Sequence, residues 1–240
     1  MEFQVLGPVR VIPDEGPQIR LGSAEQRRLT SLLALHAGSV VMSDLLSDKL
    51  GLSPGALRTS ISRLRRALGS DVLVTAPPGY LLRTRDVDAR KFEDVIRIAR
   101  ARDAWAAISL YKSALGLWRG EAYAEFSHEL WAMAESRRLE ELRSGAVEHL
   151  AELLLAQHEF AEAVAYLEPM ISKHPFRDRP RSLLIRALAE SGRRVDALRA
   201  FQAYRTFLAQ EVGTEPSSEF VALENEIVSE ALNHVVTPRI

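Results

Sequence analysis

One stretch, residues 55–68, limits most strongly what this chain can fold into. Its apolar residues recur at intervals of three and four, which is the spacing of one face of an α-helix: Leu57, Ile61, Leu64 and Leu68. Ser53 suits the N-cap of such a helix, Pro54 its first turn and Gly69 the position just past its end. The sequence therefore predicts an amphipathic helix with a defined start and end.

The other faces of this helix carry cationic and hydroxyl side chains: Arg58, Thr59, Ser62, Arg63, Arg65 and Arg66. Between Lys49 and Ser70 the chain has no acidic residue. Arginine can pair with guanine edges or with phosphates, and serine and threonine serve either target. From the helix alone two interpretations stay open, a helix that lies in a DNA groove and an ordinary helix with a solvated basic face.

The order of the surrounding elements is more specific. Alternating apolar residues and turn residues in 1–22 predict three or four short antiparallel strands. A first helix starts with a capping box at Ser23 and Gln26 and is closed by Gly38, and a second, short helix runs from Ser43 or Asp44 to Leu50, before Gly51. After the basic helix, two strands at 72–75 and 80–82 flank a tight turn at 76–79.

Strands, three helices and a C-terminal hairpin, with a basic third helix, predict a winged helix whose third helix enters the major groove of DNA. The hairpin is then the wing beside the backbone or minor groove. Arg83 and Arg85, which follow it, are candidates for phosphate contacts. Residues 1–88 carry 11 Lys/Arg against 9 Asp/Glu, in a chain whose net charge is −1, so the charge supports this interpretation only weakly.

The second half is helical in pattern. Asp86–Arg90 is interpreted as a short linker, and residues 91–232 predict seven or eight helices. The segment 160–167 aligns with 194–201 at an offset of 34 residues, with Ala163 and Ala197 as the matching small residues. This is the tetratricopeptide period, so the sequence predicts a helical array that offers a surface to protein partners. Its aromatic residues are interpreted as packing between helices: Trp105, Tyr111, Trp118, Trp131, Phe160, Tyr166, Phe201, Tyr204 and Phe207.

Several function classes find no support in the sequence. The chain has no cysteine, no basic and apolar leader and no uninterrupted apolar run of membrane-spanning length, which predicts a cytoplasmic protein without a membrane partner. Phosphate-binding, dinucleotide and nucleophile-elbow motifs are missing. His158-Glu159 begins like a zinc helix, but Glu162 stands where a second histidine is needed. We therefore expect no enzyme activity, no catalytic residue, no metal and no cofactor.

The chain resembles the Streptomyces antibiotic regulatory protein (SARP) family of transcription activators, in which an OmpR-type winged helix precedes a bacterial transcriptional activation domain. The residues that carry the resemblance follow the family's order: 3–7, 61–69, Thr75, 78–82, 114–120, 138–143, 174–178, 191–193, 197–198, Tyr204, 211–213 and 215–216. They span about residues 1–230. The combination is far more specific than any single motif.

This resemblance implies a mainly α fold with a small amount of β-structure, in three parts: a winged-helix domain at 1–88, a tetratricopeptide-like activation domain at 89–232 and a tail at 233–240. It implies binding to direct repeats in double-stranded promoter DNA by two protomers side by side, contact with RNA polymerase holoenzyme and a nucleoid-associated location. Arg58, Thr59, Ser62, Arg63 and Arg66 become groove-facing candidates, and Arg65 a phosphate or flank contact.

One departure from the family pattern lies between the second and third helices. The segment 49–54 is shorter than in family members and lacks their Trp. In this fold that loop often touches polymerase, so the departure either removes this activation contact or changes the angle of the recognition helix. Two alternatives also stay open, an interaction adaptor whose winged helix does not bind DNA and the N-terminal part of a longer regulator.

Overall fold

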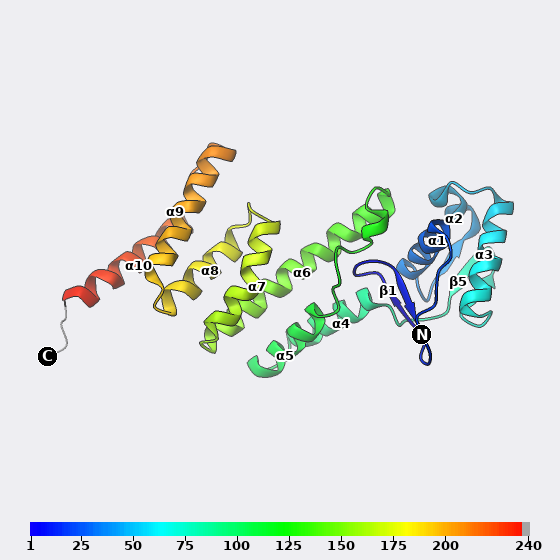
Figure 1. Cartoon of the computed structure of the whole chain (residues 1–240), viewed down its shortest axis with the longest axis horizontal. Helices are drawn as coiled ribbons and strands as arrows, with labels where there is room; N and C mark the ends of the chain where they lie inside the picture. The colour runs from blue at the N-terminus through cyan, green and yellow to red at the C-terminus, as the bar shows by residue number, and fades with distance from the viewer. Residues whose placement is uncertain (237–240) are drawn as a thin grey trace. The chain divides into compact units, whose positions relative to one another are not determined.

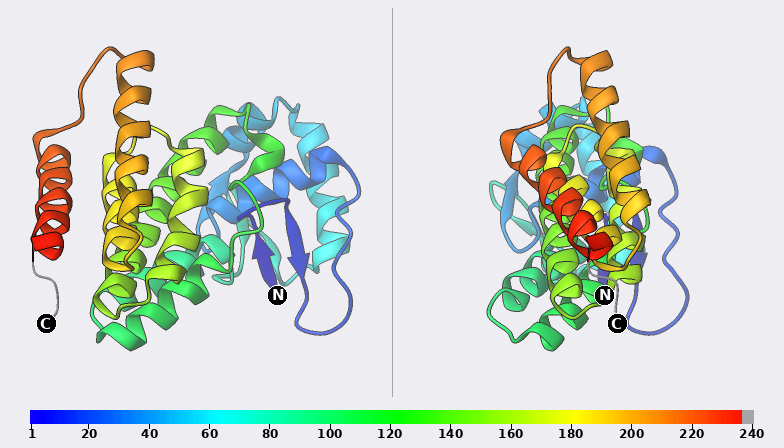
Figure 2. Two further views of the ribbon diagram at one scale, coloured as in Figure 1. Left: turned by 60° about the vertical axis from the view of Figure 1, so that its left-hand side comes forward. Right: turned by 90° about the vertical axis from the view of Figure 1, so that its left-hand side faces the viewer.

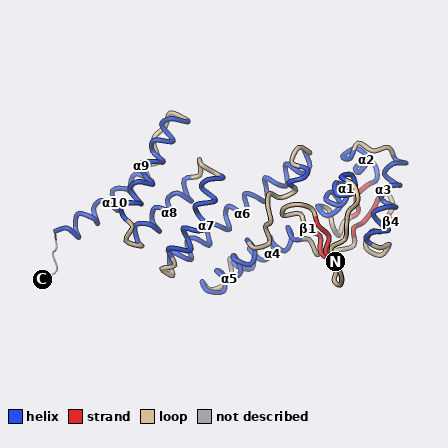
Figure 3. The backbone as a smooth tube through the Cα atoms, in the orientation of Figure 1, coloured by secondary structure: helices blue, strands red, loops and turns tan. Residues whose placement is uncertain are grey.

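The computed structural model describes residues 1–236 and forms two compact units. The N-terminal unit consists of Met1–Arg102 and Ser109–Arg143, and the C-terminal unit of Asp103–Ile108 and the chain from Ser144 onward. The fold is mainly α, as predicted, and in the described part of the chain all strands belong to the N-terminal unit (Figure 3). No helix among residues 1–236 has the length and apolar character that crossing a bilayer requires.

The N-terminal unit opens with a two-stranded antiparallel sheet of β1 (Glu2–Gln4) and β2 (Arg10–Ile12). Phe3 pairs with Val11, and an isolated bridge joins Val11 to Ile19. Both Phe3 and Val11 are buried, which explains the alternation of apolar and polar residues in this region. Residues 1–22 thus form two strands and one isolated bridge, fewer strands than the three or four predicted.

Three helices follow where the sequence predicted them: α1 (Ala24–Leu35), α2 (Ser43–Leu50) and α3 (Pro54–Leu68) (Figure 1). The hydroxyl oxygen of Ser23 accepts a hydrogen bond from the Gln26 backbone N–H at 3.2 Å, and that of Ser53 caps α3 in the same way. Gly51 ends α2 in the left-handed conformation, with φ of 63°, which glycine adopts at low cost. The caps predicted at Ser23, Ser53 and Gly51 are confirmed, whereas α1 ends at the C-cap His36, before the predicted Gly38.

A second sheet completes the winged helix. Its strands, β3 (Val40–Met42), β4 (Leu73–Ala76) and β5 (Gly79–Leu82), are antiparallel in the order β3-β5-β4. The hairpin of β4 and β5 was predicted, and β3 was not. At Gly79 an added Cβ would lie 1.8 Å from the carbonyl oxygen of Val41, so only glycine lets β5 approach β3 this closely.

The linker predicted at Asp86–Arg90 is wrong. Helix α4 (Asp88–Ala99) begins there, and Asp88 is only 1% exposed. Its carboxylate accepts hydrogen bonds from the backbone N–H groups of Val5 (2.7 Å) and Leu6 (3.1 Å) and from Arg119 Nη2 (3.1 Å). Burial raises the pKa of Asp88, and the three donors act in the opposite direction. A buried, fully bonded carboxylate holds the segment in place.

The region after α4 also packs into the N-terminal unit. It comprises the later part of α5 (Ala104–Leu115), the 3₁₀ helix η1 (Ala124–Phe126) and the first half of α6 (Leu130–Ala156). The backbone N–H of Arg119 donates to the Leu6 carbonyl, and that of Tyr123 to the Val5 carbonyl, each at 2.8 Å. The chain between α5 and α6 is therefore bonded directly to the segment that leaves β1.

The C-terminal unit is a helical array. Its last helices are α7 (Phe160–Lys173), α8 (Asp178–Glu190), α9 (Arg194–Glu211) and α10 (Ser218–Val236). Helices α7, α8 and α9 lie side by side in both views of Figure 2. Helices α7 and α9 begin 34 residues apart, as the sequence period predicted, and Ala163 and Ala197 are both fully buried. The small residues allow neighbouring helices to approach closely.

Within residues 1–236, seven α-helices and one 3₁₀ helix follow β5, in agreement with the predicted seven or eight. Helix α10 continues past the predicted end of the array at Leu232, and the last four residues of the predicted tail, 237–240, lie outside the described part. Most of the aromatic residues are buried or half-buried, as predicted. Trp105 is the exception, since it is 63% exposed.

Candidate nucleic-acid interface

Helix α3 separates its apolar and polar residues as the sequence predicted. The residues that face the core are buried: Leu57, Ser60, Ile61, Leu64 and Leu68. Arg58, Thr59, Ser62 and Arg66 project from the opposite side and are exposed, and Arg63 is exposed on one flank. This arrangement follows from the 3.6-residue period of the helix. One contiguous surface thus presents guanidinium and hydroxyl groups to solvent.

The charges on this surface have no partner in the part of the chain that the structure describes. Among residues 1–236, no hydrogen bond or ion pair holds the guanidinium groups of Arg58, Arg63 and Arg66. The Thr59 hydroxyl donates to the Gly55 carbonyl at 3.1 Å, within the helix. An arginine that has no ion pair within the protein can bind an external anion without giving up the free energy of an existing pair. The surface is chemically suited to a phosphate backbone and base edges.

Arg65 lies differently from the other arginines of α3. It is half-buried, and its Nε donates to the Leu73 carbonyl and its Nη2 to the Thr75 hydroxyl, each at 2.9 Å. Both acceptors belong to β4, so this side chain ties α3 to the hairpin of β4 and β5. On the buried side, the Ser60 hydroxyl donates to the Glu25 carboxylate, which ties α3 to the start of α1.

The wing tip consists of residues 76–79 and carries no charged side chain. The carbonyl of Pro78 accepts a hydrogen bond from the backbone N–H of Ser43 at 3.2 Å, which joins the tip to the start of α2. Any cationic side chain that reaches a ligand near the wing tip therefore belongs to a neighbouring element.

The structure does not bring Arg83 and Arg85 to the wing tip. They follow β5 at the end remote from the tip, and the backbone N–H of Arg83 donates to the Val72 carbonyl at 2.8 Å. Both side chains are exposed. Arg85 lines a hollow of about 410 Å³ together with a cation, two carboxylates and the turn after α1: Ala37, Gly38, Ser39, Arg90, Glu93 and Asp94.

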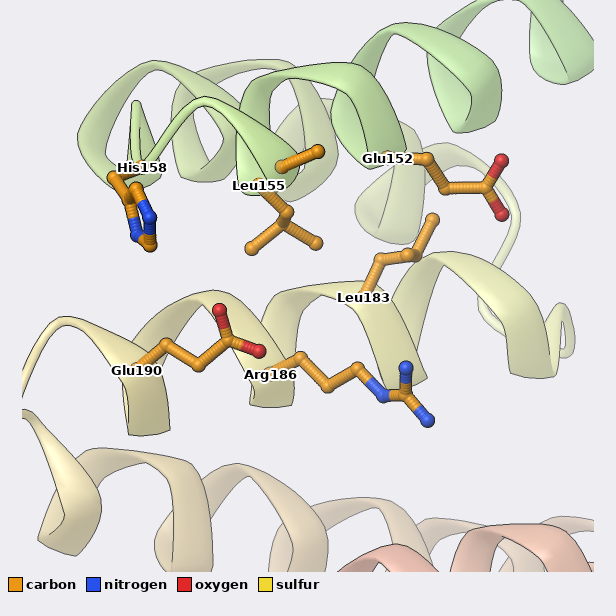
Figure 4. A pocket seen from close by; sticks show the side chains of 7 residues that line it. Glu152, Leu155, His158, Leu183, Arg186 and Glu190 are labelled. Atoms are coloured by element: carbon orange, nitrogen blue, oxygen red, sulfur yellow. The ribbon is translucent and has the colours of Figure 1, made fainter.

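A second hollow of about 410 Å³ lies in the C-terminal unit. Leu155 and Leu183 approach each other across it, and His158 and Glu190 project into the same gap (Figure 4). Glu152 and Arg186 complete its rim. Charged groups of both signs thus surround two leucines. In the described residues no group of three or more His, Cys, Asp or Glu side chains is placed to hold a metal ion.

The sequence did not predict two ion pairs that join α1 to the segment before α6. Arg27 Nε forms an ion pair with Glu125 Oε2 at 2.6 Å, and Arg28 Nη2 pairs with Glu129 Oε2 at 2.7 Å. Each pair joins α1 to the chain before α6, about a hundred residues away. No local pattern in the sequence signals such pairs, because each partner alone looks like a surface charge.

Comparison with known proteins shows which protein family the chain resembles. The profile described as bacterial transcriptional activator domain matches residues 87–228. Regulatory protein AfsR of Streptomyces griseus is 36% identical over 241 residues, which cover 95% of this chain and 24% of that protein. Regulatory protein DnrI of Streptomyces peucetius is 34% identical over 254 residues and is covered to 92% of its length.

Among solved structures, Mycobacterium tuberculosis EmbR in complex with a low-affinity phosphopeptide has a similar fold. The TM-score is 0.84 at 28% identity, and the match covers 95% of this chain and 65% of the EmbR chain. The chain spans about a quarter of the length of the AfsR proteins, whose coverage is 24%, and most of the length of DnrI.

Proposed function

The chain belongs to the Streptomyces antibiotic regulatory protein family of transcription regulators, and from this premise we propose that it binds promoter DNA in a sequence-specific manner and activates transcription. One observation carries the proposal: the outward face of α3 presents Arg58, Ser62 and Arg66, which have no side-chain partner among residues 1–236. The proposed operator is a pair of direct repeats, occupied by two protomers side by side.

We propose residues 1–88 as the DNA-binding domain and 89–232 as the activation domain. Arg58, Thr59, Ser62, Arg63 and Arg66 contact the groove, by base edges or by phosphates. Arg83 and Arg85, which lie away from the wing tip, contact phosphates at the edge of the site if the DNA bends toward them. The activating partner is RNA polymerase holoenzyme, and the site of action is the cytoplasmic nucleoid.

The test begins by selecting bound fragments of genomic DNA from the source organism with the purified chain at low and moderate salt. Enrichment of a direct repeat spaced near one helical turn supports the proposal. No enrichment at either salt, from folded protein, contradicts it and favours the adaptor alternative.

The selected repeat then serves to test α3. The double variant Arg58→Ala/Arg66→Ala is expected to lose about 1–3 kcal/mol of specific binding free energy for each residue that reads a base. A residue that contacts only phosphate weakens all sequences alike and reduces the salt slope by about one. The matched control, Arg100→Ala/Arg102→Ala, removes the same charge from exposed positions after α4. Unchanged binding by the α3 variant excludes this helix as the interface.

A further inference from the structure

Arg28 of α1 joins three parts of the N-terminal unit. Its Nη1 donates to the Leu50 carbonyl at 2.9 Å, and its Nη2 donates to the Lys49 carbonyl at 2.9 Å and to Glu129 Oε2 at 2.7 Å. The side chain is 26% exposed and that of Glu129 only 17%. A guanidinium group is suited to this task because its donors have a fixed planar geometry.

The two carbonyl groups that Arg28 holds are at the C-terminus of α2. The last carbonyl groups of a helix have no intrahelical N–H partner, so an external donor determines how they are satisfied. Only Gly51, Leu52 and Ser53 separate them from α3. In so short a connection, the position of the α2 end sets the position and angle of the recognition helix.

Glu129, the other partner of Arg28, lies outside the winged helix in sequence. It follows η1 directly before α6, within the part of the chain that matches the activator-domain profile. Its backbone is itself held, since its N–H donates to the Phe126 carbonyl at 2.9 Å and its carbonyl accepts from the Met133 N–H at 2.8 Å. The carboxylate therefore orients Arg28 from a fixed point.

We infer that Arg28 is a positioning residue for the recognition helix and that Glu129 of the activation domain sets its orientation. The activation domain thereby determines DNA affinity through the α2–α3 turn without touching DNA. This role rests on the proposed function of α3 as the DNA-reading helix. It also extends that function, because DNA binding becomes a property of residues on both sides of the predicted domain limit.

The chain contains a matched control. The neighbouring pair of Arg27 and Glu125 joins the same two segments, with Nε and Oε2 2.6 Å apart, and Glu125 Oε1 also accepts from the Val9 N–H at 2.9 Å. The exposed fractions of its side chains, 33% and 27%, are similar to those of the first pair. It has no recorded contact with Lys49 or Leu50 among the described residues. Loss of either pair should cost similar stability, and only loss of Arg28 should disturb the turn.

The experiment compares Arg28→Gln, Arg28→Lys and Glu129→Gln with Arg27→Gln and Glu125→Gln, each in the full chain at a temperature where all are folded. Backbone hydrogen exchange is measured without DNA at Gly51 and Leu52, whose N–H groups donate to Asp48 and Ser47. Binding to the selected repeat and to non-specific DNA is measured at one salt concentration.

Arg28→Gln is expected to increase exchange at both amides and to lower the ratio of specific to non-specific affinity about tenfold, because the charged hydrogen bonds to the turn are lost. Glu129→Gln should give a smaller change in the same direction, and Arg28→Lys should restore part of the ratio. The Arg27 and Glu125 variants should leave both readouts at the wild-type values.

The inference is overturned if Arg28→Gln leaves both readouts at their wild-type values. These readouts are the exchange rates at Gly51 and Leu52 and the ratio of specific to non-specific DNA affinity. Equal changes in the Arg27 and Arg28 variants also overturn it, because they indicate a general loss of stability. A wild-type chain that binds no DNA contradicts the proposed function instead, and the exchange rates at Gly51 and Leu52 then decide by themselves whether Arg28 positions the turn.

Discussion

The arginines of α3 and those of the C-terminal array differ in their neighbours. In the array, arginines lie next to carboxylates: Arg177 Nε is 3.3 Å from Glu148, Arg179 Nη2 is 2.5 Å from Glu152 and Arg193 Nε is 2.9 Å from Asp196. On the outward face of α3, no ion pair joins Arg58, Arg63 or Arg66 to a carboxylate of the described residues. The role of an arginine therefore depends on whether the fold supplies a counter-charge. In the array these three arginines are held by carboxylates, and on α3 Arg58, Arg63 and Arg66 remain available to an external anion.

The largest expected effect on DNA affinity comes from placing a carboxylate beside the arginines of α3, as the array does for its own arginines. Ser62→Glu places a carboxylate four residues from both Arg58 and Arg66, where i,i+4 ion pairs form and each stabilises the helix by about 0.2–0.5 kcal/mol. The added charge also repels phosphates, so specific DNA affinity should fall about 100-fold in an equilibrium binding measurement.

Ser62→Gln introduces a side chain of the same size as glutamate but without its charge, so it controls for steric effects. This variant should lose less affinity for the repeat than Ser62→Glu. The contrast between α3 and the array fails if Ser62→Glu binds the repeat as tightly as Ser62→Gln does.

A smaller effect is expected at Glu148, which is buried beneath Arg177 and Arg179 in the array. Glu148→Gln removes the counter-charge of two arginines and should lower the free energy of unfolding of the C-terminal unit by about 1–3 kcal/mol. Chemical denaturation measures this loss. Glu152→Gln, at a more exposed carboxylate, is the control and should cost about 0–1 kcal/mol. Equal costs at the two positions would show that burial of the counter-charge is not what matters.

The smallest effect is expected for Asp196→Asn, which releases Arg193 and leaves Arg199, whose Nη1 is 4.0 Å away, without this neighbour. Both side chains are exposed, so stability should change by less than about 1 kcal/mol. Non-specific DNA binding at low salt should rise slightly, with no gain for the repeat. A gain in specific binding would show that unpaired arginine alone makes an interface, without the shape of the winged helix.

Much of the winged helix was predictable because its signals are local. Ser23, Ser53 and Gly51 mark helix ends by chemistry that operates within one turn, and the apolar face of α3 follows from residue spacing alone. Strand β3 was missed because three residues are too few to show a period. Its existence depends on Gly79, which admits the Val41 carbonyl from a distant part of the chain.

The start of α4, which was predicted to be a linker at Asp86–Arg90, was mispredicted for a similar reason. Asp88 follows turn-like, charged residues, and in sequence such a carboxylate indicates a solvated linker. The structure surrounds it with the Val5 and Leu6 N–H groups and with Arg119, so a residue that looks polar and exposed becomes a buried acceptor. A buried charge is tolerated when donors compensate its desolvation, and those donors come from positions that no local pattern connects.

The sequence by itself determined helices α1 to α3, the hairpin of β4 and β5, the 34-residue period and the cationic face of α3, because the signals for each come from residue spacing and local chemistry. Only the tertiary structure decided which arginines keep a free charge, since Arg65 bonds to β4 and Arg28 to the end of α2, whereas Arg58 and Arg66 bond to nothing within residues 1–236. The physical reason is that an ion pair or hydrogen bond needs a partner at about 3 Å, and folding selects that partner from the whole chain.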